Sequence, residues 1–185
     1  PTDDVDCVVE VTSQREYYRL SATLRDLGLS EDTSPGAPLC RWLCEGVKLD
    51  VMPVDPQVLG FGNRWYERGV ADALDFSLPN GIEIKIFALA YLLASKIEAF
   101  GSRGRNQFYF SKDFEDIITL FNGCPNLIAE IAASEVEVRT FITAWVRTER
   151  KNLDAMAPAF LSNADRLAGR DKLLLETIAK VGEIL

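Results

Sequence analysis

Short apolar stretches bounded by turn residues predict strands in the first half of the chain. The expected strands cover residues 4–11, 39–44, 47–51, 74–78 and 82–86. In the first and third of these, apolar and polar residues largely alternate, which places the apolar side chains on one face. Glu45-Gly46 and Pro79-Asn80-Gly81 are tight-turn signals between consecutive strands. We therefore expect two hairpins.

Helical signals dominate the second half of the chain, and one helix is expected in the first half. The expected helices cover residues 14–27, 88–100, 112–122, 125–133, 135–150 and 163–184. Ser13 is the expected N-cap of the first helix, and Gly28 ends it before a loop at residues 29–37. The sequence thus predicts an α+β protein with a small mixed or antiparallel sheet followed by a C-terminal helical bundle. We expect the two parts to be residues 1–87 and 88–185.

Composition places the chain among ordinary globular proteins. It has 185 residues, of which 48% are hydrophobic and 26% charged, enough to bury a substantial core. No apolar run reaches the roughly 18 residues of a membrane span, and no export signal precedes the first strand. We expect a cytoplasmic protein with no membrane partner.

The absence of histidine narrows the possible chemistry. The four cysteines do not form CxxC pairs, and without histidine the common zinc sites and the Ser-His-Asp triad cannot be assembled. An enzyme of this composition depends on carboxylates and lysines. Twenty basic and 28 acidic residues give a net charge of −8, which argues against nucleic-acid binding by the whole surface but leaves room for a local basic patch.

Three aspartates are candidate metal ligands. Asp4 and Asp6 share one face of the first strand, where neighbouring carboxylates repel each other unless a cation lies between them. Asp50 lies on the face of strand 47–51 opposite its apolar residues, between Lys48 and Met52. If the two strands pair side by side, the three carboxylates converge in the arrangement that holds Mg²⁺ for phosphoryl transfer. In the alternative interpretation, Asp4 and Asp6 are solvated residues at the start of a strand, and Asp50 is a charged residue at the edge of the sheet.

Lys96 is a candidate anion-binding residue. It interrupts an apolar helical stripe that includes Leu93 and Phe100, so its amine either reaches the rim of the core or points into a pocket that holds an anion. Arg103, Arg105 and Lys112 follow in a segment without acidic residues between Glu98 and Asp113. This segment suits a phosphate or the end of a nucleic acid, or it is a solvated loop.

Asp113 and Asp116 lie in the first turns of the expected helix 112–122. Ser111 is its expected N-cap, so helix-dipole stabilisation alone can explain Asp113. Asp116 has no such explanation, and we expect it to pair with Lys96 or with an arginine.

Four motifs together resemble the nucleotidyltransferase family that includes the AbiEii-type toxins of bacterial abortive-infection and toxin–antitoxin systems, which belong to the polymerase-β-like superfamily. They are TDDVD at 2–6, LDVMPVD at 49–55, LLASKIEAF at 92–100 and KDFEDIITL at 112–120. The resemblance covers about residues 1–122 and implies a nucleotidyltransferase α/β core. The helices beyond it look variable in the family.

The resemblance implies a role for each candidate residue. Asp4 and Asp6 would be metal ligands for Mg²⁺ or Mn²⁺, and Asp50 the third carboxylate. Lys96 would contact the phosphates of a nucleoside triphosphate, with Asp113 or Asp116 holding it in place. The implied reaction transfers a nucleotide from NTP to an acceptor such as RNA or tRNA and releases pyrophosphate, and an antitoxin protein is an implied partner. Arg103 and Arg105 favour a nucleic-acid acceptor.

The family's glycine-rich phosphate-binding segment should precede Asp4, and we expect it upstream of Pro1 in the natural chain. Three alternatives stay open. They are an antibiotic adenylyltransferase of the aminoglycoside type, a catalytically degenerate interaction module, and a DxD-type phosphatase, which gives Asp50 no role.

Overall fold

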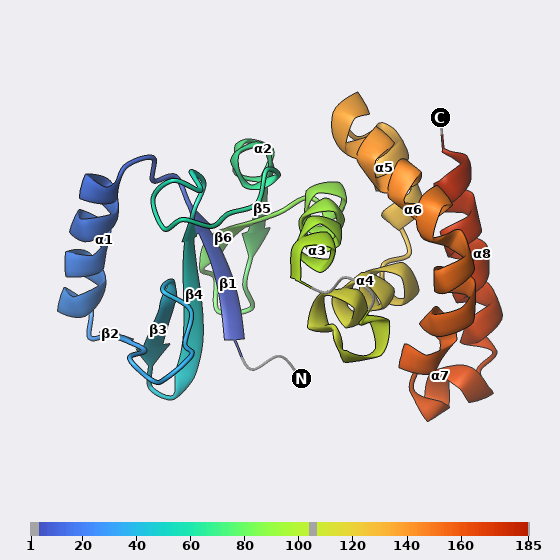
Figure 1. Cartoon of the computed structure of the whole chain (residues 1–185), viewed down its shortest axis with the longest axis horizontal. Coiled ribbons are helices and arrows are strands. Elements are labelled where there is room, and N and C mark those ends of the chain that lie inside the picture. Colours follow the sequence, from blue (N-terminus) through green and yellow to red (C-terminus); the bar gives the residue numbers. More distant parts are fainter. Residues whose placement is uncertain (1–3, 104–106, 185) are drawn as a thin grey trace. The chain divides into compact units, whose positions relative to one another are not determined.

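A computed structural model describes residues 4–103 and 107–184 (Figure 1). The chain divides into two compact units, Pro1–Ala71 and Asp72–Leu185. The first unit contains the larger sheet and the second contains most of the helices, which confirms the expected α+β class. The expected domain boundary after residue 87 stays a prediction.

The first unit is built on a mixed sheet. Its elements are β1 (Asp4–Val9), α1 (Gln14–Asp26), β2 (Ser30–Glu31), β3 (Arg41–Cys44), β4 (Val47–Pro53) and α2 (Tyr66–Ala71). The strands lie in the order β1-β4-β3-β2 (Figure 1). β1 is parallel to β4, whereas β3 is antiparallel to both β4 and β2. The parallel pair places two strands from distant parts of the chain side by side.

Local signals set the ends of α1 and the β3–β4 turn. Ser13 Oγ accepts a hydrogen bond from Glu16 N at 3.3 Å, as expected for an N-cap. The turn residues Glu45 and Gly46 both have positive φ, 49° and 86°, which is the backbone of a type I′ hairpin turn. This turn fixes the antiparallel register of β3 against β4.

Helix α1 covers the apolar face of the sheet. The Tyr17 hydroxyl donates to the Val51 carbonyl at 3.2 Å, and the Arg25 guanidinium lies 5.8 Å from the centre of the Trp42 ring. Trp42 and Val51 are almost fully buried. Because side chains alternate along a strand, the residues that neighbour Trp42 and Val51 in sequence, Arg41 and Asp50, belong to the opposite face.

The second unit begins with a hairpin and continues as a helical bundle. Its elements are β5 (Leu74–Ser77), β6 (Glu83–Ile86), α3 (Leu89–Arg103), η1 (Phe108–Phe110), α4 (Lys112–Gly123), α5 (Leu127–Ala133), α6 (Val136–Met156), η2 (Ala157–Phe160), α7 (Asn163–Leu167) and α8 (Arg170–Glu183). Fully buried aliphatic and aromatic side chains, such as Leu93, Phe114, Ile142 and Ile178, form the bundle core. Within residues 4–103 and 107–184, no helix is long and apolar enough to cross a membrane.

Three differences between the structure and the predicted elements are the clearest. The expected helix 163–184 is two helices, because Gly169 adopts a left-handed backbone with φ of 70° between α7 and α8. The expected loop 29–37 contributes the short edge strand β2. The short helix α2 was not predicted from the sequence; it starts where Asn63 Oδ1 accepts from Trp65 N at 3.1 Å.

Candidate active site

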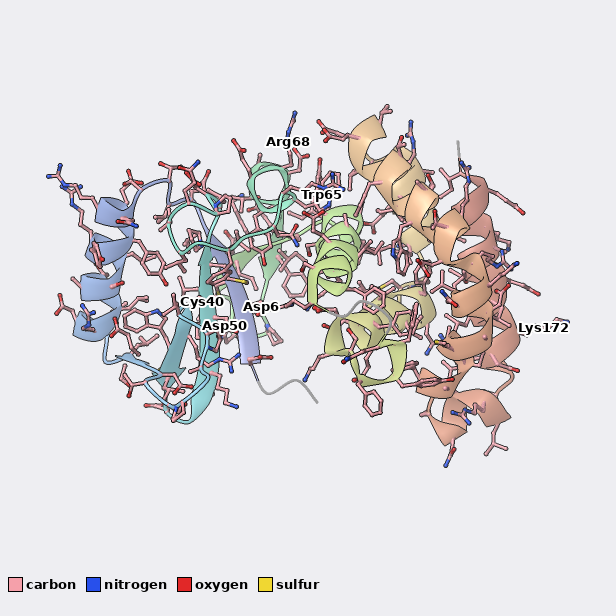
Figure 2. The ribbon with its side chains drawn as sticks, in the orientation of Figure 1. Asp6, Cys40, Asp50, Trp65, Arg68 and Lys172 are labelled. Atoms are coloured by element: carbon pink, nitrogen blue, oxygen red, sulfur yellow. The ribbon has the colours of Figure 1, made fainter. Side chains whose placement is uncertain are left out.

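Three charged side chains lie in one row across the sheet of the first unit. Asp6 on β1 is the register partner of Asp50 on β4, and Asp50 is the register partner of Arg41 on β3. Residues opposite each other in a sheet share a face, so the three side chains emerge on the same side, together with Asp4 two residues before Asp6. Figure 2 shows Asp6 and Asp50 on their neighbouring strands. The expected pairing of the two aspartate-bearing strands is therefore present.

Arg41 joins two of the three carboxylates. Its Nε donates to Asp50 Oδ1 at 2.8 Å, and its Nη2 donates to Asp50 Oδ2 at 2.7 Å. The same Nη2 lies 3.2 Å from Asp4 Oδ2. The guanidinium therefore reaches from β3 across β4 to a carboxylate on β1, and it offsets negative charge on a face that would otherwise be strongly repulsive.

The Arg41–Asp50 pair is well shielded from solvent. The side chains of Arg41 and Asp50 are 18% and 11% exposed, against 31% for Asp4. The hydrogen bonds with Asp50 raise the pKa of Arg41 above its already high usual value, so the guanidinium stays charged. A shielded carboxylate needs such a partner, because an unpaired buried charge is costly.

Asp6 is the most accessible of the three carboxylates. It is exposed, and it lies on the β1 side of Asp50, whereas Arg41 lies on the β3 side. Its neighbour Cys7 belongs to the other face; burial, and secondarily the charge of Asp6, raise the pKa of the Cys7 thiol. Asp6 is thus placed to meet a ligand that approaches the sheet from solvent.

The three carboxylates suit a hard divalent cation, because they offer oxygen ligands and lie on one face of the sheet. Three carboxylates on two adjacent parallel strands supply the oxygen ligands that Mg²⁺ prefers. Both oxygens of Asp50 already accept from Arg41, and across the described residues no three Asp, Glu or Cys side chains stand as a ready metal site. A cation at these carboxylates would therefore share Asp50 with Arg41 or replace the guanidinium beside it.

Cys40 lies beside this cluster and gives the first unit a pH dependence (Figure 2). Burial, and after it the charge of Asp50, raise the pKa of the Cys40 thiol from 9.0 to about 11. The unfolded chain ionises first as the pH rises between these values, so the free energy of unfolding falls, by at most about 1.4 kcal/mol per pH unit. We expect Cys40→Ala to flatten this fall in denaturant unfolding curves recorded from pH 8 to pH 11. Equal slopes in the two proteins would contradict the assignment.

Lys96 and Asp116 form an ion pair within the second unit. Lys96 Nζ on α3 lies 2.7 Å from Asp116 Oδ2 on α4, with side chains 23% and 34% exposed. The pairing matches the partner expected for Asp116. The amine lies at the rim of the helical core, where Leu93 and Phe100 are buried, and it is neither in the core nor fully in solvent.

Arg103 and Asp113 form a second link between α3 and the start of α4. Arg103 Nη2 donates to Asp113 Oδ1 and Oδ2 at 2.9 and 3.2 Å. Ser111 Oγ accepts from Phe114 N at 3.3 Å, which confirms the expected N-cap, so Asp113 both favours the helix start and holds Arg103. Arg105 lies outside the described residues.

A shallow pocket of about 190 Å³ opens beside this link. Its lining residues are Arg103, Gln107, Phe110, Ser111, Lys112 and Asp113. Phe110 is 89% exposed, which is unusual for a phenylalanine. The pocket therefore combines two cationic side chains with an exposed aromatic ring.

The candidate residues thus belong to two groups, each within one unit. Asp4, Asp6 and Asp50 lie in the first unit; Lys96, Arg103, Asp113 and Asp116 lie in the second. The residue missed from the sequence is Arg41. A two-residue turn at Glu45-Gly46 places Cys44 opposite Val47 and therefore Arg41 opposite Asp50, so the hairpin register was the signal that could have found it.

Comparisons with protein-family models, curated proteins and solved structures found no match to this chain.

Proposed function

We propose that this protein is a Mg²⁺-dependent nucleotidyltransferase that transfers a nucleoside monophosphate from NTP to an acceptor hydroxyl. The observation that carries the proposal is the register of β1 and β4, which puts Asp6 opposite Asp50 and all three candidate carboxylates on one face. Phosphoryl transfer depends mainly on positioning and charge neutralisation, so it suits a chain that has no histidine.

In this proposal, Asp4, Asp6 and Asp50 would hold the divalent ion. A bound ion would supply neutralisation of the phosphate charge. The acceptor oxygen forms the new bond to the α-phosphorus, the bond to pyrophosphate breaks, and a carboxylate oxygen of Asp50 takes the hydroxyl proton. Arg41 orients that carboxylate through its two hydrogen bonds.

The resemblance assigns the phosphate and acceptor contacts to residues that lie within the second unit. Lys96 is held by Asp116 with its amine at the rim of the core, where it can donate to a phosphate oxygen. Arg103, Lys112 and the exposed ring of Phe110 suit an RNA end, because cations bind its phosphates and an aromatic ring stacks on a base. A cationic antibiotic would be repelled by the same side chains, so RNA such as tRNA is the favoured acceptor.

The proposal is tested by incubating the protein with each of the four α-labelled NTPs, MgCl₂ and total RNA. We expect label on RNA that disappears with EDTA and returns with excess Mg²⁺. Parallel reactions contain an aminoglycoside in place of the RNA. Label on the antibiotic alone would show an adenylyltransferase of the other class, and no label on either acceptor would contradict the proposal.

Lys96→Met separates a phosphate contact from a structural role. Methionine keeps an unbranched apolar stem, and the lost ion pair is partly exposed, so we expect the free energy of unfolding to fall by about 1 kcal/mol or less. Transfer activity should fall about 100-fold, because a contact to the charged phosphates is lost. The matched control, Asp116→Asn, keeps the cation and should lose much less activity. Equal losses in the two variants would assign the pair to structure alone.

Arg41 favours a second candidate, a catalytically degenerate interaction module. A guanidinium that bridges Asp4 and Asp50 satisfies these carboxylates without any metal. Titration with Mn²⁺, followed by its electron paramagnetic resonance signal, distinguishes the two. A module that relies on this ion-pair cluster should leave Mn²⁺ free in solution, whereas the proposed enzyme should bind it. An antitoxin partner would be compatible with either function.

A further inference from the structure

The β5–β6 hairpin of the second unit has one apolar and one charged face. Leu74 is opposite Ile86 and Phe76 is opposite Ile84, so these four side chains share a face. The other face has Asp75 opposite Lys85, whose Nζ lies 2.9 Å from Asp75 Oδ1.

The apolar face and the outer edge of β6 are open. Five large apolar side chains, Leu74, Phe76, Ile82, Ile84 and Ile86, are 38% to 55% exposed. Among the described strands, β5 and β6 pair only with each other. An exposed edge strand rich in isoleucine is a template for adding another strand.

The hydrogen-bond pattern shows which backbone groups this edge presents. Leu78 N donates to Ile82 O at 2.8 Å, so Leu78 and Ile82 form a hydrogen-bonded pair. Hydrogen-bonded and non-hydrogen-bonded pairs alternate in an antiparallel ladder, so Ile84 and Ile86 also direct their backbone groups toward β5. The N–H and C=O groups of Glu83 and Lys85 consequently point to the outer edge.

Residues 82–86 read Ile-Glu-Ile-Lys-Ile, a pattern that complements itself in the antiparallel direction. With Ile84 opposite Ile84 of another copy, Glu83 faces Lys85 of that copy twice, and Ile82 faces its Ile86 twice. This register also makes Glu83–Lys85 the hydrogen-bonded pairs, as the outward backbone groups require. The neighbouring registers place Glu83 opposite Glu83 or Lys85 opposite Lys85, where like charges repel.

The other edge is a poorer site for self-pairing. Its outward residues are Asp75 and Ser77, which offer no opposite charges to each other. Pairing of β5 with β6 of another copy is head-to-tail and would not close into a dimer. Charge complementarity and the need for two-fold closure therefore both select the β6 edge.

We propose that the protein self-associates as a two-fold dimer through antiparallel pairing of β6 with β6 of a second copy. The two hairpins then form one four-stranded sheet, with Ile84 at the two-fold axis and two reciprocal Glu83–Lys85 ion pairs. This proposal is independent of the enzymatic one.

Analytical ultracentrifugation of the full chain and its charge variants tests the dimer. We expect the wild type to show a reversible monomer–dimer equilibrium. Glu83→Lys and Lys85→Glu each place like charges in both pairs, and each should raise the dissociation constant at least about tenfold. An equimolar mixture of the two variants restores both ion pairs in a heterodimer, so association should return.

Glu176→Lys on α8 is the matched control, because it makes the same charge change at an exposed position outside the hairpin. It should associate like the wild type. Lys85→Glu also loses the bond to Asp75, whereas Glu83 faces Ser77, so Glu83→Lys keeps the test valid if the other variant loosens the hairpin. A monomeric wild type, or charge variants that all dimerise equally, would overturn the proposal.

A cysteine at the axis tests the register itself. In Ile84→Cys, the two thiols of the dimer would be opposite each other in a non-hydrogen-bonded pair, where Cβ atoms are close enough for a disulfide. Mild oxidation should give a covalent dimer on a non-reducing gel. Ile82→Cys, which faces Ile86 of the other copy, and the wild type with its native cysteines should give much less. Equal cross-linking in all three proteins would exclude this register.

Discussion

Asp6→Asn is expected to reduce nucleotidyl transfer at least about 100-fold while leaving the protein folded. The substitution removes one negative charge and one good oxygen ligand from the carboxylate face, and it preserves the size of the side chain. Because Asp6 is exposed, the free energy of unfolding should change little. The measurements are incorporation of labelled nucleotide into RNA, Mn²⁺ binding and a denaturant unfolding curve.

Glu10→Gln is the matched control for Asp6→Asn. Glu10 is also an exposed acid and lies just beyond the end of β1, so its substitution makes the same charge change away from Asp50. It should keep both transfer activity and Mn²⁺ binding. If the two variants behave alike, the carboxylate face has no metal-binding role and the proposed function fails.

Arg41→Gln is expected to destabilise the first unit by about 2–3 kcal/mol. The substitution removes three charge-assisted hydrogen bonds and leaves the shielded side chain of Asp50 without its partner. Asp4 and Asp50 would then repel each other across adjacent strands. Urea unfolding followed by the fluorescence of the tryptophans, which include the buried Trp42, measures the loss.

The Arg41→Gln/Asp50→Asn double variant checks that the loss comes from the ion pair. Removing both charges should cost less than the sum of the single substitutions, because no shielded charge stays unpaired. Divalent cations provide a second check. Mn²⁺ can compensate the carboxylates in place of the guanidinium, so it should stabilise Arg41→Gln more than the wild type. No added stabilisation would indicate that Arg41 and the cation do not act on the same carboxylates.

The two clusters of candidate residues, one in each unit, could be predicted from the sequence to different extents. Lys96 was one of the two kinds of partner expected for Asp116, because Lys96 interrupts an apolar stripe and no helix-cap role explains Asp116, and the structure shows this pair. The common face of Asp4, Asp6 and Asp50 was predicted on the condition that their strands pair. The role of Arg41 was not predicted, because it depends on the β3–β4 register, which places Arg41 opposite Asp50.

Short-range sequence signals specify the local elements of this protein. Alternation, caps and turn residues act over a few neighbours, so they specify both hairpins, the start of α1 and the start of α4. The parallel pairing of β1 with β4 depends on long-range packing, because these strands are joined by a long connection that includes α1, which packs against β4. The same is true of the bond between Arg41 and Asp4, which needs the side chain of β3 to cross a whole strand. Asp4 and Asp50 thus acquire Arg41 as their counter-ion only when the sheet forms.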